Sequence, residues 1–299
     1  MNNIKSSFSI KDLENLTGIK AHTIRIWEKR YNLLNPERTE TNIRCYSLES
    51  LQLLLNVSFL YDQGYKISKI ANLAPDEIPE LVKEISNKNL THTHAINAFK
   101  LAMLNFDQKL FNETYLSLEQ EKGFLKIFYE DLIPLMSEIG MLWQTSTITP
   151  AHEHFLTTLI RQKLLVNTEA IQFSADIKHD KVFVLYLPDN EVHELGLMLV
   201  NYELLAKGYK TIYLGQSVPI DSLRDLQNYY HEITFLSYFT IKPEKDLLVD
   251  YINEFKDKLL NNKHMQLWVL GRMLAELDVT QLPKQITPFT SISDIVKIL

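Results

Sequence analysis

The sequence Lys181-Val-Phe-Val-Leu-Tyr-Leu-Pro-Asp-Asn-Glu-Val-His-Glu-Leu-Gly196 decides how the C-terminal part of this chain folds. The residues before Pro188 are rich in β-branched and aromatic side chains, which is typical of a buried strand. An apolar helical pattern then runs from Leu195 to a stop at Gly208. The pattern predicts a strand, a loop and a helix. His193 lies just beyond the carboxyl end of the strand, where open α/β sheets bind their ligands.

Glu191 and His193 in this loop form a pair that suits a transition metal. A neutral imidazole is a good metal ligand, and a carboxylate two residues earlier can accept the proton of the other ring nitrogen. A zinc site made by protein alone takes roughly three or four ligands, so a metal that arrives inside a macrocycle would fit this pair instead. Gly196 removes a side chain where a bulky ligand would lie against the helix start. An ordinary loop histidine and glycine explain the same spacing, so the residues alone leave both interpretations open.

The residues that follow repeat the alternation of strand and helix. The predicted strands are 181–187, 210–214, 233–239, 265–270 and a weak one near 285–289, and the predicted helices are 191–207, 220–230, 243–262, 272–278 and 291–299. This order predicts a Rossmann-like, doubly wound parallel sheet over residues 177–299, with the flavodoxin-like strand order.

Residues 93–176 upstream have helical periodicity instead. Helices are predicted over 95–104, 106–120, 124–143 and 149–170, which together make a four-helix bundle. The Pro-, Asn- and Ser-containing residues 76–92 before them are predicted to form a linker with a short helix inside it. The whole chain is therefore expected to be multidomain, α and α/β.

The loop motif Glu191-x-His193-x-x-Gly196 resembles the Asp/Glu-x-His-x-x-Gly signature of cobalamin-binding Rossmann-like domains. The resemblance implies that His193 is the lower axial ligand of cobalt. That family also has Ser-x-Leu after the third strand and Gly-Gly after the fourth, which line the channel for the nucleotide tail. Here the third strand ends in Ser237-Tyr-Phe and the fourth in Gly271-Arg, so each is half a match. Ser237 and Gly271 are accordingly candidate contacts of the tail.

A second signature lies in the predicted bundle. Light-sensing regulators of the CarH/LitR-like family carry a Trp, nine residues and then Glu-His, and this chain has Trp143 followed by Glu153 and His154 at that spacing. The resemblance implies that these three residues cap the upper face of the cofactor. In relatives the residue after the Trp can be a His that takes the upper position on cobalt. Gln144 stands there in this chain, and an amide is a poor cobalt ligand, so a state formed after illumination would have to differ from that of the relatives or use His152 or His154.

The first 75 residues predict a winged helix-turn-helix. Ser9 is a good N-cap for a helix that ends at Thr17-Gly18, and a second helix follows up to Tyr31. Two short helices joined by a tight Gly turn place the second helix in the DNA major groove. A short, basic segment from Asn32 onward is a candidate β-wing.

The second helix carries Ile24-Arg-x-Trp-Glu-x-Arg-Tyr31, which resembles the head of MerR-type transcription regulators. Asn42 replaces the usual wing-tip Gly, and Asn tolerates the left-handed conformation, so the wing should survive. Trp27 is expected in the core. The candidate DNA-binding residues, most of them facing phosphate, are His22, Thr23, Arg25, Lys29, Arg30, Arg38, Arg44 and Tyr46.

Charge is distributed unevenly along the chain. The first 75 residues carry a formal charge of +3, whereas the remainder carries −9, which together make the net −6. The head is therefore the part suited to a polyanion. No apolar run approaches the ~20 residues needed to span a bilayer, and the start of the sequence lacks an apolar signal core, so no membrane association and a cytoplasmic location are expected.

Three interpretations of function follow. The first is a transcription regulator, not an enzyme, whose operator binding and oligomer state are controlled by a cobalamin, with adenosylcobalamin and a photoreceptor role implied by the resemblance. Its expected partners are double-stranded operator DNA and further copies of itself, as a dimer or tetramer. Whether it also binds RNA polymerase is left open by the sequence. The second is the same regulator with a degenerate sensor that binds no corrinoid and acts through protein contacts. The third, the cobalamin module of a methyltransferase or mutase, would need a catalytic domain larger than the head.

Overall fold

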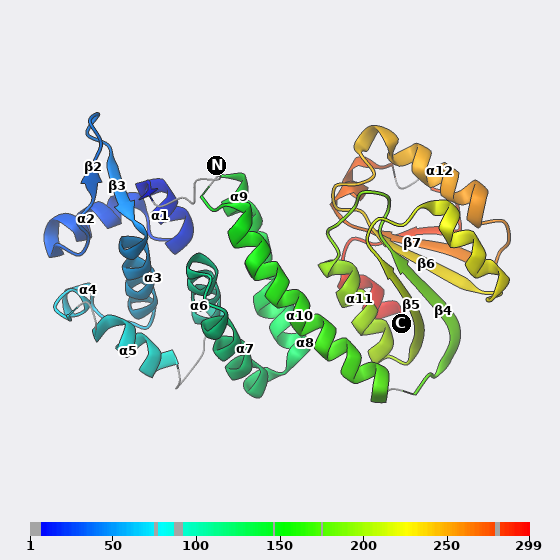
Figure 1. The fold of residues 1–299 in the computed structure, drawn as a ribbon, viewed down its shortest axis with the longest axis horizontal. Helices are drawn as coiled ribbons and strands as arrows, with labels where there is room; N and C mark the ends of the chain where they lie inside the picture. The colour runs from blue at the N-terminus through cyan, green and yellow to red at the C-terminus, as the bar shows by residue number, and fades with distance from the viewer. Residues whose placement is uncertain (1–6, 75–76, 87–91, 146, 175, 279–281) are drawn as a thin grey trace. The chain divides into compact units, whose positions relative to one another are not determined.

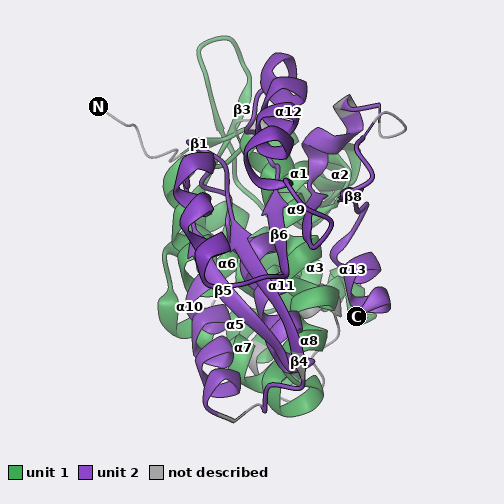
Figure 2. Ribbon diagram, turned by 90° about the vertical axis from the view of Figure 1, so that its right-hand side faces the viewer, with its two compact units in different colours: residues 1–160 green, residues 161–299 purple. Residues whose placement is uncertain are grey.

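A computed structural model of the protein describes residues 7–74, 77–86, 92–145, 147–174, 176–278 and 282–299. The chain divides into two compact units, residues 1–160 and residues 161–299, which Figure 2 colours separately. Within the described ranges, no helix is both long and apolar enough to cross a membrane.

The first unit begins with the predicted winged helix-turn-helix (Figure 1). Its elements are β1 (Ser7–Phe8), α1 (Ile10–Thr17), α2 (Ala21–Tyr31), β2 (Glu37–Arg38), β3 (Arg44–Ser47), α3 (Leu48–Asp62) and α4 (Ile67–Ile70). The Ser9 hydroxyl accepts the amide of Asp12 at 3.2 Å and the Asp12 carboxylate accepts the amide of Ser9 at 2.8 Å, so a capping box starts α1. Gly18, with φ of 74°, ends it. The strands form a small antiparallel sheet in the order β1-β3-β2.

Two expectations about the head are confirmed. Asn42 has φ of 63° and its amide donates to the Thr39 carbonyl at 2.8 Å, so it turns the wing in the left-handed conformation. Trp27 is only 5% exposed and packs edge-on against Tyr61, with ring centroids 5.2 Å apart. Trp27 therefore anchors α2 to α3 from inside the core.

Helices make up the rest of the first unit. They are α5 (Glu77–Ser86), α6 (His92–Asn105), α7 (Gln108–Lys122), α8 (Phe124–Ile127), the π-helical turn η1 (Phe128–Leu132), α9 (Ile133–Gln144) and α10 (Pro150–Ser174), which continues into the second unit. The single regular helix predicted over 124–143 is wrong, because a π-helical turn interrupts it. That wider turn holds the fully buried Asp131, whose carboxylate pairs with Lys122 Nζ at 2.5 Å. Neither the π-helical turn nor the ion pair changes the spacing of apolar residues in the sequence, so the periodicity could not predict them.

The second unit is a doubly wound α/β domain. Its elements are β4 (His179–Tyr186), α11 (Leu195–Ala206), β5 (Tyr209–Gly215), η2 (Ile220–Asn228), β6 (Ile233–Tyr238), η3 (Lys245–Leu247), α12 (Leu248–Leu259), β7 (Met265–Leu270), η4 (Arg272–Glu276), β8 (Ile286–Pro288) and α13 (Ile292–Ile298). The five strands are parallel in the order β5-β4-β6-β7-β8, which confirms the flavodoxin-like order. Val184, Phe235 and Leu267 belong to one hydrophobic core cluster with Phe255 of α12, and the rings of Phe235 and Phe255 pack edge-on.

Some helices of this unit differ from the prediction. Residues 220–228 and 272–276 are 3₁₀-helices, and α11 begins at Leu195 rather than at Glu191. Short amphipathic segments bury one face with either helical period, so the sequence pattern does not separate the two forms. In the loop before α11, the Glu191 carboxylate accepts the amides of Val192 and His193.

Candidate functional site

Glu191 joins two loops at the carboxyl edge of the parallel sheet. Its side chain is fully buried. One carboxylate oxygen, Oε1, accepts the amides of Val192 and His193 at 2.9 and 3.0 Å and contacts His193 Nδ1 at 2.5 Å. The other, Oε2, accepts the amides of Thr240, Ile241 and Lys242 at 3.2, 2.7 and 2.9 Å. A single carboxylate therefore holds the loop after β4 against the loop after β6.

These hydrogen bonds keep Glu191 ionised. Burial raises the pKa of its carboxyl, but the bonds from the His193 ring and from the amides of Ile241, His193 and Lys242 outweigh burial and lower the pKa to about 2. An anion that accepts a ring N–H fixes the tautomer of the imidazole and raises its basicity. With Nδ1 turned to Glu191, Nε2 is the nitrogen of His193 that would ligate a metal.

His193 meets the requirements of an axial metal ligand. Its side chain is 48% exposed, although the carboxylate that orients it is buried. Among the residues that the structure describes, no cluster of three or more His, Cys, Asp or Glu side chains could hold a bare metal ion. One oriented imidazole fits a metal whose equatorial ligands come with it, as cobalt does in a corrin ring.

The sequence analysis did not identify a second carboxylate beside His193, that of Glu194. Glu194 is 6% exposed, pairs with Arg161 Nε at 2.7 Å and accepts the Tyr213 hydroxyl at 3.1 Å. Burial and the adjacent Glu194 raise the pKa of Tyr213, so it stays a protonated donor at neutral pH. The sequence shows Glu194 directly after His193. It does not show the partners of Glu194, because Arg161 and Tyr213 lie on a distant helix and strand. Glu194 thus connects the loop that carries His193 to α10 and β5.

Gly196 and the two predicted tail-channel residues, Ser237 and Gly271, lie near this edge. Gly196 lies in the first turn of α11, and a Cβ added there would come within 2.5 Å of the Tyr238 ring. Ser237 is fully buried, and its hydroxyl donates to the Tyr186 carbonyl at 3.0 Å. Gly271 has φ of 116° and lies against the backbone of Phe239, so it tolerates no side chain. Their roles toward a cofactor stay predictions.

The predicted upper-face residues all lie in the first unit. Trp143, in the last turn of α9, is 54% exposed. Glu153 lies in the first turn of α10, and its carboxylate contacts Nδ1 of the neighbouring His154 at 3.2 Å. Residues 145–149 connect the two helices. Trp143, Glu153 and His154 therefore belong to one end of a helical hairpin, two of them with exposed side chains.

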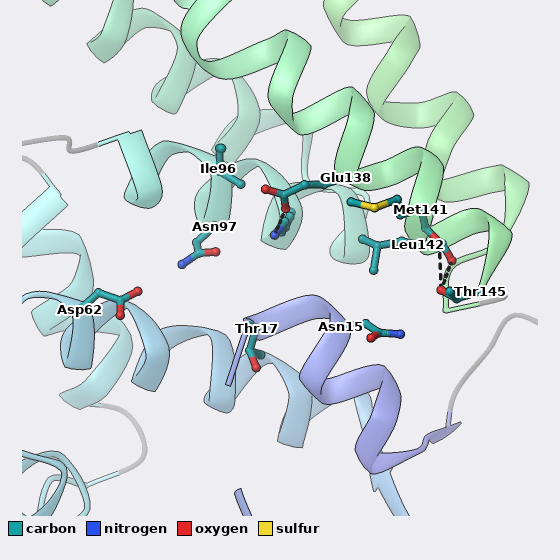
Figure 3. A pocket seen from close by; sticks show the side chains of 11 residues that line it. Asn15, Thr17, Asp62, Ile96, Asn97, Glu138, Met141, Leu142 and Thr145 are labelled. Carbon is teal, nitrogen blue, oxygen red and sulfur yellow. Dashed lines mark hydrogen bonds and ion pairs between the residues drawn. The ribbon is translucent and has the colours of Figure 1, made fainter. Parts of the chain in front are cut away.

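The connection between α9 and α10 also contacts the DNA-binding head. Thr147 is fully buried, and its hydroxyl donates to the Asp12 carboxylate of α1 at 3.2 Å. Lys100 of α6 is 6% exposed, pairs with Glu138 of α9 and points its Nζ at the Leu16 carbonyl, 3.5 Å away at the end of α1. A pocket of about 570 Å³ lies beside these contacts, between α1, α3, α6 and α9 (Figure 3). Buried polar contacts thus hold the head to the helices that carry Trp143.

Removing the Thr147 hydroxyl should loosen this junction. Thr147→Val keeps the shape of the side chain but leaves the Asp12 carboxylate without that donor, and we expect a loss of about 1–3 kcal/mol in the unfolding free energy of the first unit. Urea unfolding followed by tryptophan fluorescence measures it. Thr157→Val is the matched control, because the Thr157 hydroxyl donates only to carbonyls of its own helix. Equal effects of both substitutions would contradict a special role for Thr147.

The predicted DNA contacts divide into two groups. His22, Arg25, Lys29, Arg30 and Arg38 are exposed and Thr23 is half-buried, on α2 and the wing. Arg38 Nη1 donates to the Asn42 side chain at 2.7 Å, which steadies it beside the wing tip. These side chains are accessible to a duplex, and their contacts with DNA stay a prediction.

Arg44 and Tyr46 are held differently, because both converge on Glu28. Arg44 Nε donates to Glu28 Oε1 at 3.0 Å, and the hydroxyl of Tyr46 donates to Glu28 Oε2 at 3.0 Å. Tyr46 is 1% exposed, and burial followed by the bond to Glu28 raises the pKa of its phenol. In this conformation Tyr46 is a core residue that joins the wing to α2, so a phosphate contact from its hydroxyl would require it to leave Glu28. The sequence could not show this, because Glu28 lies on a different element.

Two family descriptions match separate parts of the chain. Residues 8–77 match the MerR HTH family regulatory protein, and residues 95–166 match the B12 binding domain. The HTH-type transcriptional repressor CarH of Myxococcus xanthus is 28% identical over 223 residues, 73% of this chain and 73% of that protein. The HTH-type transcriptional repressor CarA of the same organism is 26% identical over 222 residues, 72% of this chain and 70% of that protein.

A solved structure has a similar fold over most of the chain. The monomethylamine corrinoid protein of Methanosarcina barkeri superposes with a TM-score of 0.56 at 13% identity, over 70% of this chain and 98% of that chain. At this identity the likeness shows the fold alone. The two family matches and the similarity to CarH and CarA support a MerR-type, DNA-binding transcription regulator with a B12-binding domain.

Proposed function

We propose that this regulator holds a cobalamin through His193, and that the state of the cobalamin sets its affinity for operator DNA. The observation that carries the proposal is the Glu191–His193 pair, in which a buried carboxylate orients a half-exposed imidazole at 2.5 Å. His193 Nε2 would hold the cobalt, and Glu191 would keep the ring in the correct tautomer. The corrin ring supplies the remaining equatorial ligands.

The helical hairpin of the first unit serves the opposite face of the cofactor in this proposal. Trp143 packs against the upper ligand, and Glu153 and His154 line the same end of the hairpin. Adenosylcobalamin, the form that the resemblance to light-sensing regulators implies, supplies a cobalt–carbon bond that light breaks. A change in the upper ligand would then alter the packing of Trp143.

The buried contacts of the head give this change a route to DNA. The connection that follows Trp143 donates to the Asp12 carboxylate of α1 through Thr147. A shift of that connection therefore alters the support of the helix-turn-helix. Assembly into a homodimer or homotetramer adds a second effect, because linked heads bind neighbouring half-sites with an avidity that a single head lacks.

The experiment is a visible absorption spectrum of the full chain after incubation with adenosylcobalamin and gel filtration in the dark, repeated after illumination. We expect the corrinoid to co-elute with the protein and to show the spectrum of a histidine-ligated cobalt. Light should change both the spectrum and the elution volume. Complete loss of the corrinoid on the column would contradict the proposal and favour a degenerate sensor.

Glu191→Gln should weaken cobalamin binding by roughly 10–100-fold, which is typical when the group behind a metal ligand is lost. The side-chain amide of Gln points an N–H group at one set of the N–H donors that the Glu191 carboxylate accepts. The neutral side chain also loses the charge that orients the His193 ring. A titration of the visible spectrum measures the change. Glu244→Gln removes an exposed carboxylate near the loop after β6 and serves as the control. Equal affinities of the Glu191→Gln variant and the wild type would contradict the orienting role.

A further inference from the structure

Tyr238 fills the space in front of Gly196. It ends β6, in the position between Ser237 and Phe239. A Cβ built on Gly196 would lie 2.5 Å from Cε2 and 2.9 Å from Cζ of the Tyr238 ring. The phenol is mostly buried, and burial raises its pKa. In this structure the open side of Gly196 thus receives an aromatic ring of the chain itself.

The neighbouring polar groups are also bonded within the protein. The buried hydroxyl of Ser237 donates to the Tyr186 carbonyl at 3.0 Å. Arg272 Nε donates to the Thr240 carbonyl at 2.7 Å, although that side chain is exposed. Gly271 is required by the close approach of the Phe239 backbone. Ser237, Gly271 and Arg272 therefore each contact other parts of the protein in this structure.

We infer that Tyr238 determines which corrinoids this chain accepts, by competing with their lower nucleotide for the space over Gly196. The inference rests on the proposed function, since it requires that a corrinoid binds above His193. A benzimidazole is a flat aromatic group like the phenol ring, and two such rings cannot occupy one space. Binding of the complete cobalamin requires the Tyr238 ring to swing away, and the apparent affinity falls by the fraction of molecules in that state.

A corrinoid that lacks the nucleotide avoids this competition. The wild type is therefore selective for truncated corrinoids over complete ones, while His193 and Glu191 serve both. In this inference the single side chain of Tyr238 decides whether the domain prefers complete or truncated corrinoids. Removing the Tyr238 ring opens the space for the tail and reverses the preference.

The test compares hydroxocobalamin with diaquacobinamide, which has the same ring and cobalt but no nucleotide. Dissociation constants are measured from the visible spectrum for the wild-type full chain and for Tyr238→Ala and Tyr238→Phe. We expect the wild type to bind cobinamide at least as tightly as cobalamin. Tyr238→Ala should tighten cobalamin binding by about tenfold or more and leave cobinamide binding nearly unchanged. Tyr238→Phe keeps the ring and should behave as the wild type does.

The two corrinoids separate failure of this inference from failure of the proposed function. Unchanged cobinamide binding by Tyr238→Ala shows that the site has remained folded. If both corrinoids bind and their affinity ratio is the same in the wild type and Tyr238→Ala, the inference is overturned while the proposed function stands. Loss of all corrinoid binding in Tyr238→Ala alone overturns it too, because the ring would then support the site. Absence of binding by every variant overturns both.

Discussion

His193→Ala is expected to remove the histidine-ligated absorption spectrum and to weaken cobalamin binding by more than the roughly 10–100-fold that loss of a group behind a metal ligand costs. The imidazole is the only contact in this proposal that bonds directly to cobalt, so its removal eliminates a coordinate bond. Glu191, without its ring partner, keeps its amide donors from both loops. The loop should therefore keep its shape, and the loss should appear in binding rather than in folding.

The matched control is His231→Ala, which removes an exposed histidine of the same unit. It should leave the spectrum and the affinity unchanged. Thermal unfolding of the cofactor-free variants checks that neither substitution disrupts the unit. If His193→Ala bound cobalamin as tightly as the wild type with an unchanged spectrum, axial ligation would be ruled out. The region of Ser237 and Gly271 would then have to carry the affinity.

The double substitution Arg25→Ala with Arg38→Ala should weaken duplex binding by about 100-fold at 0.1 M salt, with little dependence on base sequence. Arg25 is exposed on α2 and Arg38 is exposed on the wing, so the pair spans the surface expected to contact DNA. Each phosphate contact contributes about 0.9 to the slope of log K against log salt, and the slope should fall by about 2. Fluorescence anisotropy of a labelled duplex at several salt concentrations measures both quantities.

Lys109→Ala is the control for charge alone, because Lys109 lies on α7 with an 84% exposed side chain. Its removal should change neither the affinity nor the slope appreciably. A fragment of residues 76–299 that bound duplex DNA as well as the full chain would contradict the assignment of DNA binding to the head. The contacts of Asp12 with Thr147 and of Leu16 with Lys100 make the full chain the better material for the substitutions.

The order of elements and the position of His193 could be predicted because they depend on local signals. Pro188 ends β4 and Gly208 follows α11, so strand and helix were separated correctly. The apolar strands then required burial on both faces, which doubly wound sheets provide. Ser9 and Gly18 set the limits of α1 in the same local way.

Contacts between distant segments had no such signal. The amides of Thr240 to Lys242 that bind Glu191 lie about fifty residues away, and backbone groups leave no trace in the side-chain pattern. Tyr46 was predicted as a DNA contact from the Arg-x-Tyr of the MerR-type head, whereas in the structure its hydroxyl donates to the Glu28 carboxylate and its ring is buried. Tyr238 occupies the free middle position of Ser-x-Leu, so the motif did not single it out, and its contact with Gly196 becomes apparent only when α11 and β6 are packed together.

The central claim is that cobalamin bound through His193 changes DNA binding, and the most direct test is the affinity of the full chain for a duplex selected from a random pool, with and without saturating cobalamin. The account predicts that cobalamin changes the dissociation constant of the wild type by about 5–150-fold, the usual range of coupling between two sites, and leaves that of His193→Ala unchanged. Equal dissociation constants with and without cobalamin, in wild-type protein that demonstrably retains the corrinoid, would contradict it.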